Sequence, residues 1–206
     1  MSAERWDSNR GPPAPKRLSI FLEYMKTIVL FGDSMFGRFG RKHILGMEEA
    51  LKDAVVYNCA AGGFDTRDGL KRAAFTAKLK ADYVCLSFGA NDSNPFKGRP
   101  VPIAEFVDNY REIVGAFSGS RVIIFPCPPV RDFNDLKEAE NFNAELVAYN
   151  AAIKILAEKT GVIWIDSQKI YGKSLAKGEN YHIEDGLHLN DLGYRILIRE
   201  FKKSIR

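Results

Sequence analysis

Five short apolar runs, rich in β-branched and aromatic residues, constrain the fold of this chain more than any other feature. They cover residues 27–31, 55–57, 83–86, 122–125 and 162–165. None alternates apolar with polar side chains, which is typical of strands buried on both faces, as in a parallel sheet covered by helices. The longer segments between them carry apolar residues at helical spacing, as at Phe106, Tyr110 and Ile113. We therefore predict an α/β fold, a three-layer αβα sandwich with a flavodoxin-like, doubly wound, five-stranded parallel sheet.

The start of the chain differs from the rest. A glycine and three prolines between residues 11 and 15 stand near charged residues, and no periodic apolar pattern surrounds them. We expect residues 1–24 to be a flexible N-terminal extension and residues 25–206 to form a single domain. Met25 directly precedes the first predicted strand and could itself be the start, so the sequence leaves open whether the extension is native.

Composition and charge argue against several classes of partner. The formal net charge of +4 comes from 30 basic and 26 acidic residues dispersed along the chain, too small an excess to favour nucleic acid. No apolar stretch approaches the ~20 residues that a membrane-spanning helix needs. Three widely spaced cysteines lie in or beside apolar runs, which suggests buried thiols in a reducing compartment, and three scattered histidines make a poor metal site. We expect a soluble cytoplasmic protein without a metal.

Polar residues follow the predicted strands at their carboxyl ends, where ligands bind in doubly wound folds. Gly-Asp-Ser (residues 32–34) follows the first strand, a glycine pair (residues 62–63) the second, and Gly-Ala-Asn-Asp (residues 89–92) the third. Asp-Gly-Leu-His (residues 185–188) precedes a helical segment near the C-terminus. We expect these four segments to converge on one rim of the sheet.

Ser34, Asp185 and His188 are candidates for nucleophilic catalysis. Ser34 opens a predicted helix, where its backbone N–H favours negative charge, although a serine there is more often a simple N-cap. A nucleophilic serine needs a base for its proton, and the base needs a carboxylate to fix its tautomer. Asp185 and His188 could supply both groups, or be a loop cap and a surface histidine. The expected position of these three residues at one edge of the sheet favours the joint catalytic role.

Gly63 and Asn91 could complete such a site. Acyl transfer builds negative charge on a carbonyl oxygen, and preorganised N–H donors there are usually the largest catalytic contribution. A glycine lets the backbone approach a substrate closely, and an asparagine side chain adds a donor. Each also has an ordinary alternative, a tight turn at Gly63 and a loop cap at Asn91.

In order and content, these segments resemble the SGNH hydrolases, also called the GDSL esterase/lipase family. The resemblance extends over residues 26–206 and rests on residues 32–34, 58–63, 89–92 and 185–188. It implies that Ser34 is the nucleophile, His188 the general base and Asp185 the acid that orients it. It further implies an oxyanion hole made by the backbone N–H groups of Ser34 and Gly63 and the side chain of Asn91.

Two features depart from the family pattern. Met35 stands where the family has leucine, a mild apolar change. In the second block the paired glycines give two candidate donors, and the spacing to residues 65–66 favours Gly63 over Gly62. Asp33 belongs to the first block, and we expect it to hold neighbouring backbone.

The resemblance implies hydrolysis of carboxylic esters through an acyl-enzyme intermediate, without a cofactor. The substrate would be a small soluble ester, a lysophospholipid or an acetylated sugar. Two alternatives stay open: an acyltransferase that uses the same residues, and a non-catalytic module that binds phosphate or flavin. No phosphate-binding glycine loop follows the first strand, which counts against the module.

Several other residues near the strand ends could meet a substrate, although packing or solvation is the commoner role of each. These residues are Phe36, Phe39, Phe64, Phe96, Arg67 and His182. His43 lies in a predicted helix, where packing or solvation is also expected.

Overall fold

The computed structural model describes residues 25–98, 100–131 and 136–205, and its centre is a five-stranded parallel sheet. The strands are β1 (Lys26–Gly32), β2 (Ala54–Asn58), β3 (Tyr83–Ser87), β4 (Arg121–Ile124) and β5 (Ile163–Trp164). Their order in space is β2-β1-β3-β4-β5, which is that of flavodoxin-like doubly wound sheets. The predicted fold class and the five predicted strands are therefore confirmed. The predicted extension, residues 1–24, lies outside the described residues.

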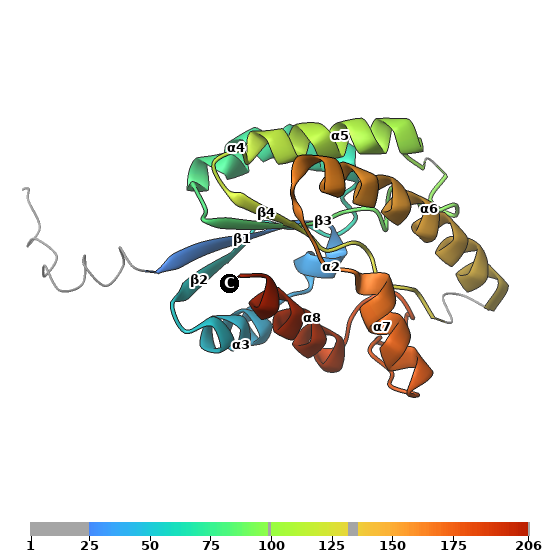
Figure 1. Cartoon of the computed structure of the whole chain (residues 1–206). Helices are drawn as coiled ribbons and strands as arrows, with labels where there is room; N and C mark the ends of the chain where they lie inside the picture. The colour runs from blue at the N-terminus through green and yellow to red at the C-terminus, as the bar shows by residue number, and fades with distance from the viewer. Residues whose placement is uncertain (1–24, 99, 132–135, 206) are drawn as a thin grey trace, which may run out of the picture.

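Helices cover both faces of this sheet (Figure 1). They are α2 (Ser34–Gly37), α3 (Arg41–Leu51), α4 (Thr66–Thr76), α5 (Ile103–Ala116), α6 (Leu136–Thr160), α7 (Ser167–Ala176) and α8 (Asp191–Ser204), with a 3₁₀ turn η1 (Ala77–Leu79) after α4. In Figure 1, α4, α5 and α6 lie on one side of the sheet, and α3, α7 and α8 lie on the other.

The core has two halves, one on each face of the sheet. Successive side chains of a strand point to opposite faces, so β1 contributes to both. Ile28 and Leu30 pack in one cluster with residues of α3 and α8, while Val29 and Phe31 pack in the other with residues of α5. All four side chains are fully buried. Burial on both faces explains why this strand is apolar at every position from Ile28 to Phe31.

Gly32 ends β1 against its neighbour β3. A Cβ added at Gly32 would lie 2.0 Å from the Ser87 carbonyl oxygen, so no larger residue fits without separating the two strands. The next residue continues the contact, because the Asp33 N–H donates to the same oxygen at 2.9 Å. The first glycine of the Gly-Asp-Ser segment is therefore required by sheet packing.

Two features bear on the expectations from composition. Cys85 and Cys127 are buried free thiols, whereas Cys59 is only partly buried. Within the described ranges, no helix is both long and apolar enough to cross a membrane.

Candidate active site

Ser34 is held at the carboxyl end of β1 by the residue before it. Asp33 is the N-cap of α2, and its Oδ1 accepts a hydrogen bond from the Met35 N–H at 2.8 Å. The Asp33 side chain is fully buried, and its Oδ2 has no hydrogen-bond partner among the described residues. Burial raises the pKa of Asp33 to about 7, the Met35 hydrogen bond opposes the rise, and the charge of Asp92 adds to it. Asp33 thus holds backbone, as expected.

The structure brings Ser34, His188 and Asp185 into one hydrogen-bonded chain. The Ser34 Oγ lies 2.7 Å from His188 Nε2, and His188 Nδ1 lies 2.6 Å from Asp185 Oδ2. A carboxylate can only accept, so Nδ1 carries the proton in the neutral imidazole and Nε2 is free to accept from the serine hydroxyl. The sequence separation between Ser34 and His188 is 154 residues. The arrangement can therefore move the serine proton onto the imidazole.

The surroundings of Asp185 favour its ionised form. Its Oδ1 accepts hydrogen bonds from the Leu187 N–H at 3.0 Å and the His188 N–H at 2.9 Å. Partial burial acts to raise the pKa of Asp185, but these two N–H groups and the His188 ring outweigh that effect, and the pKa lies below its ordinary value. The three-residue spacing lets one carboxylate bind both the ring and the backbone that carries it.

Two sets of contacts hold the segment with Asp185 and His188, one at Gly186 and one at Asn190, where α8 begins. Gly186 has φ +66°, a left-handed conformation that favours glycine, and its carbonyl accepts from the Arg131 N–H at 2.8 Å. Asn190 is the N-cap of α8, and its Oδ1 accepts from the Leu192 and Gly193 N–H groups at 2.9 and 3.0 Å. These contacts position the imidazole before any substrate arrives.

The other two predicted site residues, Gly63 and Asn91, lie on loops that contact each other. Asn91 Nδ2 donates to the Phe64 carbonyl at 2.8 Å. The loop that carries Gly63 is tied to β1 by the Ala61 N–H, which donates to the Gly32 carbonyl at 3.0 Å. Gly63 has φ +80°, and its N–H has no protein acceptor among the described residues. The four predicted segments therefore converge on one rim through direct contacts.

Gly62 and Gly63 differ in their surroundings. Gly62 lies against α2, because a Cβ added at Gly37 would approach the Gly62 nitrogen at 3.1 Å. A Cβ added at either glycine meets nothing within 4 Å, but only Gly63 has a left-handed backbone, with φ +80°. The contact of Gly62 with α2 and the left-handed backbone of Gly63 agree with the choice of Gly63 as donor, which stays a prediction.

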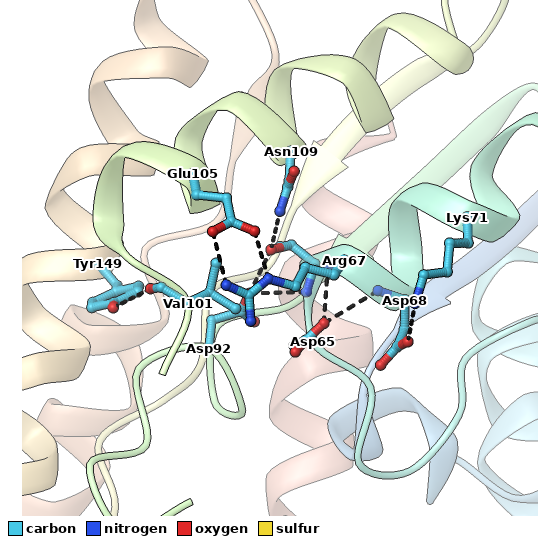
Figure 2. A network of polar contacts seen from close by, with 10 residues as sticks. Asp65, Arg67, Asp68, Lys71, Asp92, Val101, Glu105, Asn109 and Tyr149 are labelled. Atoms are coloured by element: carbon cyan, nitrogen blue, oxygen red, sulfur yellow. Dashed lines mark hydrogen bonds and ion pairs between the residues drawn. The ribbon is translucent and has the colours of Figure 1, made fainter. Parts of the chain in front are cut away.

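A buried carboxylate joins the two loops (Figure 2). Asp92 Oδ1 accepts from the Thr66 N–H at 2.8 Å and the Thr66 hydroxyl at 2.5 Å, and Asp92 Oδ2 accepts from the Gly89 N–H at 3.1 Å. Asn109 Nδ2 donates to the Thr66 hydroxyl at 3.1 Å. Burial raises the pKa of Asp92 to about 6, against the effect of the Thr66 hydrogen bonds. In the sequence, Asp92 stood out only as the last residue of the third segment, and this linkage was not predicted.

Lys97 is a second residue that sequence reasoning missed. Its Nζ donates to the Gly63 carbonyl at 2.9 Å and to Asn91 Oδ1 at 2.7 Å. No motif or spacing singles out this lysine, because it follows Asn91 in an irregular loop.

Four of the remaining candidates are engaged within the protein. Phe36 and Phe39 are fully buried in the core, and His182 is buried with its Nε2 2.9 Å from the Pro129 carbonyl oxygen. Arg67 is engaged by Glu105, with Nε and one Nη 2.5 and 2.8 Å from the two carboxylate oxygens (Figure 2). Of the predicted aromatic candidates, Phe96 is exposed.

Two further observations concern ligands. A hollow of about 520 Å³ lies next to the residues that follow His188. It is lined by Arg38, His43, Ile183, Leu189, Asn190, Asp191 and Tyr194. Among the described residues, no group of three or more His, Cys, Asp or Glu side chains is arranged to hold a metal ion.

Fold and site together define a class of protein: a doubly wound α/β sandwich with a serine–histidine–aspartate chain at the carboxyl edge of its sheet. Residues 30–196 match the sequence model of the GDSL-like Lipase/Acylhydrolase family, and the chain belongs to this family. The resemblance drawn from the four segments is thereby confirmed, and all five predicted site residues lie within the matched range.

Two curated relatives are similar to this chain. The GDSL esterase/lipase WDL1 of Oryza sativa subsp. japonica is 27% identical over 62% of this chain and 55% of its own length. The isoamyl acetate-hydrolyzing esterase of Saccharomyces cerevisiae is 26% identical over 69% of this chain and 65% of its own length. The chain thus spans only a little over half to about two thirds of these relatives.

Solved structures share the fold over most of this chain. A lipase/acylhydrolase from Enterococcus faecalis is 25% identical with a TM-score of 0.66, covering 88% of this chain and 95% of that one. The acetyl xylan esterase AlAXEase has a TM-score of 0.74 at 21% identity, covering 87% of this chain and 100% of that one. A catalytic mutant of Axe2, an acetylxylan esterase from Geobacillus stearothermophilus, has a TM-score of 0.72 at 21% identity, covering 87% of this chain and 94% of that one.

Proposed function

We propose that this protein is a serine hydrolase that cleaves carboxylic esters, with Ser34 as nucleophile, His188 as general base and Asp185 as the acid that orients the base. The observation that carries the proposal is the continuous hydrogen-bonded chain from Ser34 Oγ through the imidazole to the Asp185 carboxylate. A serine hydroxyl is a weak nucleophile unless a base takes its proton, and here the base is within hydrogen-bond reach.

Acylation follows from this geometry. Ser34 Oγ attacks the ester carbonyl carbon as its proton moves to His188 Nε2. The imidazolium that forms is stabilised by the ionised Asp185. When the bond from the carbonyl carbon to the alcohol oxygen breaks, His188 returns the proton to the leaving alcohol, and the acyl group stays on Ser34.

Deacylation repeats these steps with water. His188 takes a proton from a water molecule, whose oxygen attacks the acyl carbon, and the bond to Ser34 Oγ breaks as the proton returns to the serine. In both halves we assign the developing oxyanion to the N–H groups of Ser34 and Gly63 and to Asn91 Nδ2. An amide nitrogen carries two hydrogens, and Phe64 takes one, so the other remains for the substrate.

We further propose a small acyl group, such as acetyl. The names of the yeast relative and of two structural neighbours refer to acetate or acetyl esters, which supports a short acyl chain here. We also propose that the protein is cytoplasmic. We propose that water, and not another alcohol, accepts the acyl group.

The test is hydrolysis of nitrophenyl esters of increasing acyl length by wild type, Ser34→Ala and Ser118→Ala. Ser118 is an exposed serine just before β4, at the opposite edge of the sheet, so it serves as the matched control. We expect Ser34→Ala to lose about 10³-fold or more in kcat and Ser118→Ala to match wild type. A fluorophosphonate should label wild type at Ser34 only. Undiminished turnover by Ser34→Ala, or no turnover and no labelling in wild type, would refute the proposed function.

A further inference from the structure

Lys97 contacts both residues to which we assign the outer oxyanion donors. Its ammonium group bonds to the Gly63 carbonyl at 2.9 Å and to Asn91 Oδ1 at 2.7 Å. These acceptors lie 34 and 6 positions away in the sequence, on the loops after β2 and β3. One side chain therefore bridges the two loops at the point where the donors sit.

The contact decides which way the Asn91 amide faces. With Oδ1 on the Lys97 ammonium, Nδ2 must face the Phe64 carbonyl, to which it donates at 2.8 Å. A flipped amide would place its NH₂ group against the ammonium and its oxygen against the Phe64 oxygen, losing both hydrogen bonds. Lys97 thus keeps Nδ2, the nitrogen that we assign as a donor, facing the loop that carries Gly63.

The ammonium also strengthens the donor. A charged donor on an amide oxygen polarises the amide, and hydrogen bonds arranged in a chain reinforce one another. Burial dominates the raised pKa of Asp33, and the positive charge of Lys97 is among the effects that oppose the rise.

Hydrogen bonds hold the backbone of the loop that carries Lys97, both at the lysine and after it. The Val101 N–H donates to the Asp92 carbonyl at 2.8 Å, and the Lys97 N–H donates to the Asn94 carbonyl at 3.2 Å. The Tyr149 hydroxyl also donates to the Val101 carbonyl (Figure 2). A lysine that starts from an anchored backbone loses less freedom on forming its two bonds.

We propose that Lys97 is a positioning residue of the oxyanion hole, which orients and polarises the Asn91 amide and holds the Gly63 loop beside it. This role rests on the proposed ester hydrolysis. It differs from that of Asn91, because Lys97 acts through the amide and not on the substrate. Since the side chain is exposed to solvent, the effect should be smaller than that of removing a donor itself.

The first test compares steady-state hydrolysis of nitrophenyl acetate by wild type, Lys97→Met, Lys97→Arg and Lys71→Met. Lys71 is an exposed lysine on α4 that pairs with Asp68 at 3.3 Å, so its variant controls for the lost charge (Figure 2). We expect Lys97→Met to lower kcat about tenfold with KM within about twofold of wild type, because the effect lies in the transition state. Lys97→Arg should recover part of the loss, and Lys71→Met should match wild type.

The second test asks whether Lys97 acts through Asn91. Asn91→Ala should lower kcat by about 10²-fold, and adding Lys97→Met to Asn91→Ala should lower it little further. The Asn91 side-chain NH₂ resonances, followed by NMR without any substrate, should shift in Lys97→Met and stay in place in Lys71→Met. A full further tenfold loss in the double variant would overturn the positioning role.

The outcomes separate this inference from the proposed function. If wild type hydrolyses the ester through Ser34 while Lys97→Met keeps its kcat, only the role of Lys97 fails. If wild type neither turns over esters nor reacts with a fluorophosphonate, the proposed function fails and the role of Lys97 fails with it.

Discussion

At the scale of single residues, two carboxyl groups near Ser34 have pKa values that are shifted in opposite directions. Asp185 has three hydrogen-bond donors on its two oxygens, and its pKa is lowered despite partial burial. Asp33 has one unpartnered buried oxygen among the described residues, and burial raises its pKa to about 7. Asp185 is the aspartate that can balance an imidazolium, because it contacts the His188 ring and its hydrogen bonds outweigh the effect of burial, whereas burial dominates at Asp33.

Asp185→Asn tests this assignment at the residue scale. An asparagine would present its NH₂ group or a neutral oxygen to His188 Nδ1, and an NH₂ group there would leave the proton on Nε2, where it blocks acceptance from Ser34. We expect kcat for nitrophenyl acetate to fall by about 10³-fold with little change in the unfolding midpoint. Asp108→Asn, in an exposed aspartate paired with Arg111 on α5, is the control and should keep full activity. Wild-type kcat in Asp185→Asn would contradict the assignment.

At the scale of elements, the site depends on how α4 meets the turn after β3. Thr66 begins α4, and it gives both its N–H and its hydroxyl to buried Asp92, while Arg67 next to it pairs with Glu105 near the surface. The two contacts are made by consecutive residues, and Figure 2 labels Arg67, Glu105 and Asp92. They should not be equal in strength, because water screens an exposed ion pair and cannot replace a buried hydrogen bond.

Thr66→Val and Arg67→Met compare these two contacts. Valine keeps the shape of threonine but has no hydroxyl. Asn109 Nδ2 therefore loses an acceptor, and the Asp92 carboxylate loses a donor. We expect Thr66→Val to lower the free energy of unfolding by about 1–3 kcal/mol and to reduce kcat, because the loops with Gly63 and Asn91 lose a shared anchor. Arg67→Met should cost clearly less stability. Urea unfolding and steady-state kinetics measure both effects, and a larger loss in Arg67→Met would refute the ranking.

At the scale of the whole molecule, buried carboxyl groups make stability depend on pH. The pKa values of Asp33 and Asp92 are raised to about 7 and about 6, above the ~3.9 of an aspartate in an unfolded chain. Between these limits the folded state binds protons that the unfolded state has lost. The contribution of these groups therefore stabilises the fold at acid pH and declines as the pH rises from about 4 to about 7.

Asp33→Asn isolates one of these groups. The variant cannot titrate at this position, so its free energy of unfolding relative to wild type should rise from pH 4 to pH 7 and level off above that. The slope of the difference cannot exceed about 1.4 kcal/mol per pH unit for one proton. Urea unfolding of both proteins at each pH measures it. A difference that is flat, or that falls with pH, would show that Asp33 is ionised in the folded state across this range.

Local sequence determined the strands and the identity of the site segments. Short apolar runs such as residues 27–31, separated by segments with helical spacing, are typical of strands buried on both faces, so they predicted the parallel sheet. Gly32, Asp33 and Ser34 belong to one short segment whose roles depend on the end of a strand and the start of a helix, and both were readable in sequence. The family resemblance supplied the joint meaning of segments that are weak separately.

Tertiary structure decided every contact that joins distant segments. The 2.7 Å bond between Ser34 and His188 spans 154 positions, and the anchor between Thr66 and Asp92 spans 26. Lys97 has no local pattern at all, because an exposed lysine in a loop looks the same whether it points to solvent or to another loop. Sequence periodicity reports which side chains are buried, but the partner of a polar atom depends on how loops fold back on one another, and only the assembled sheet edge fixes that.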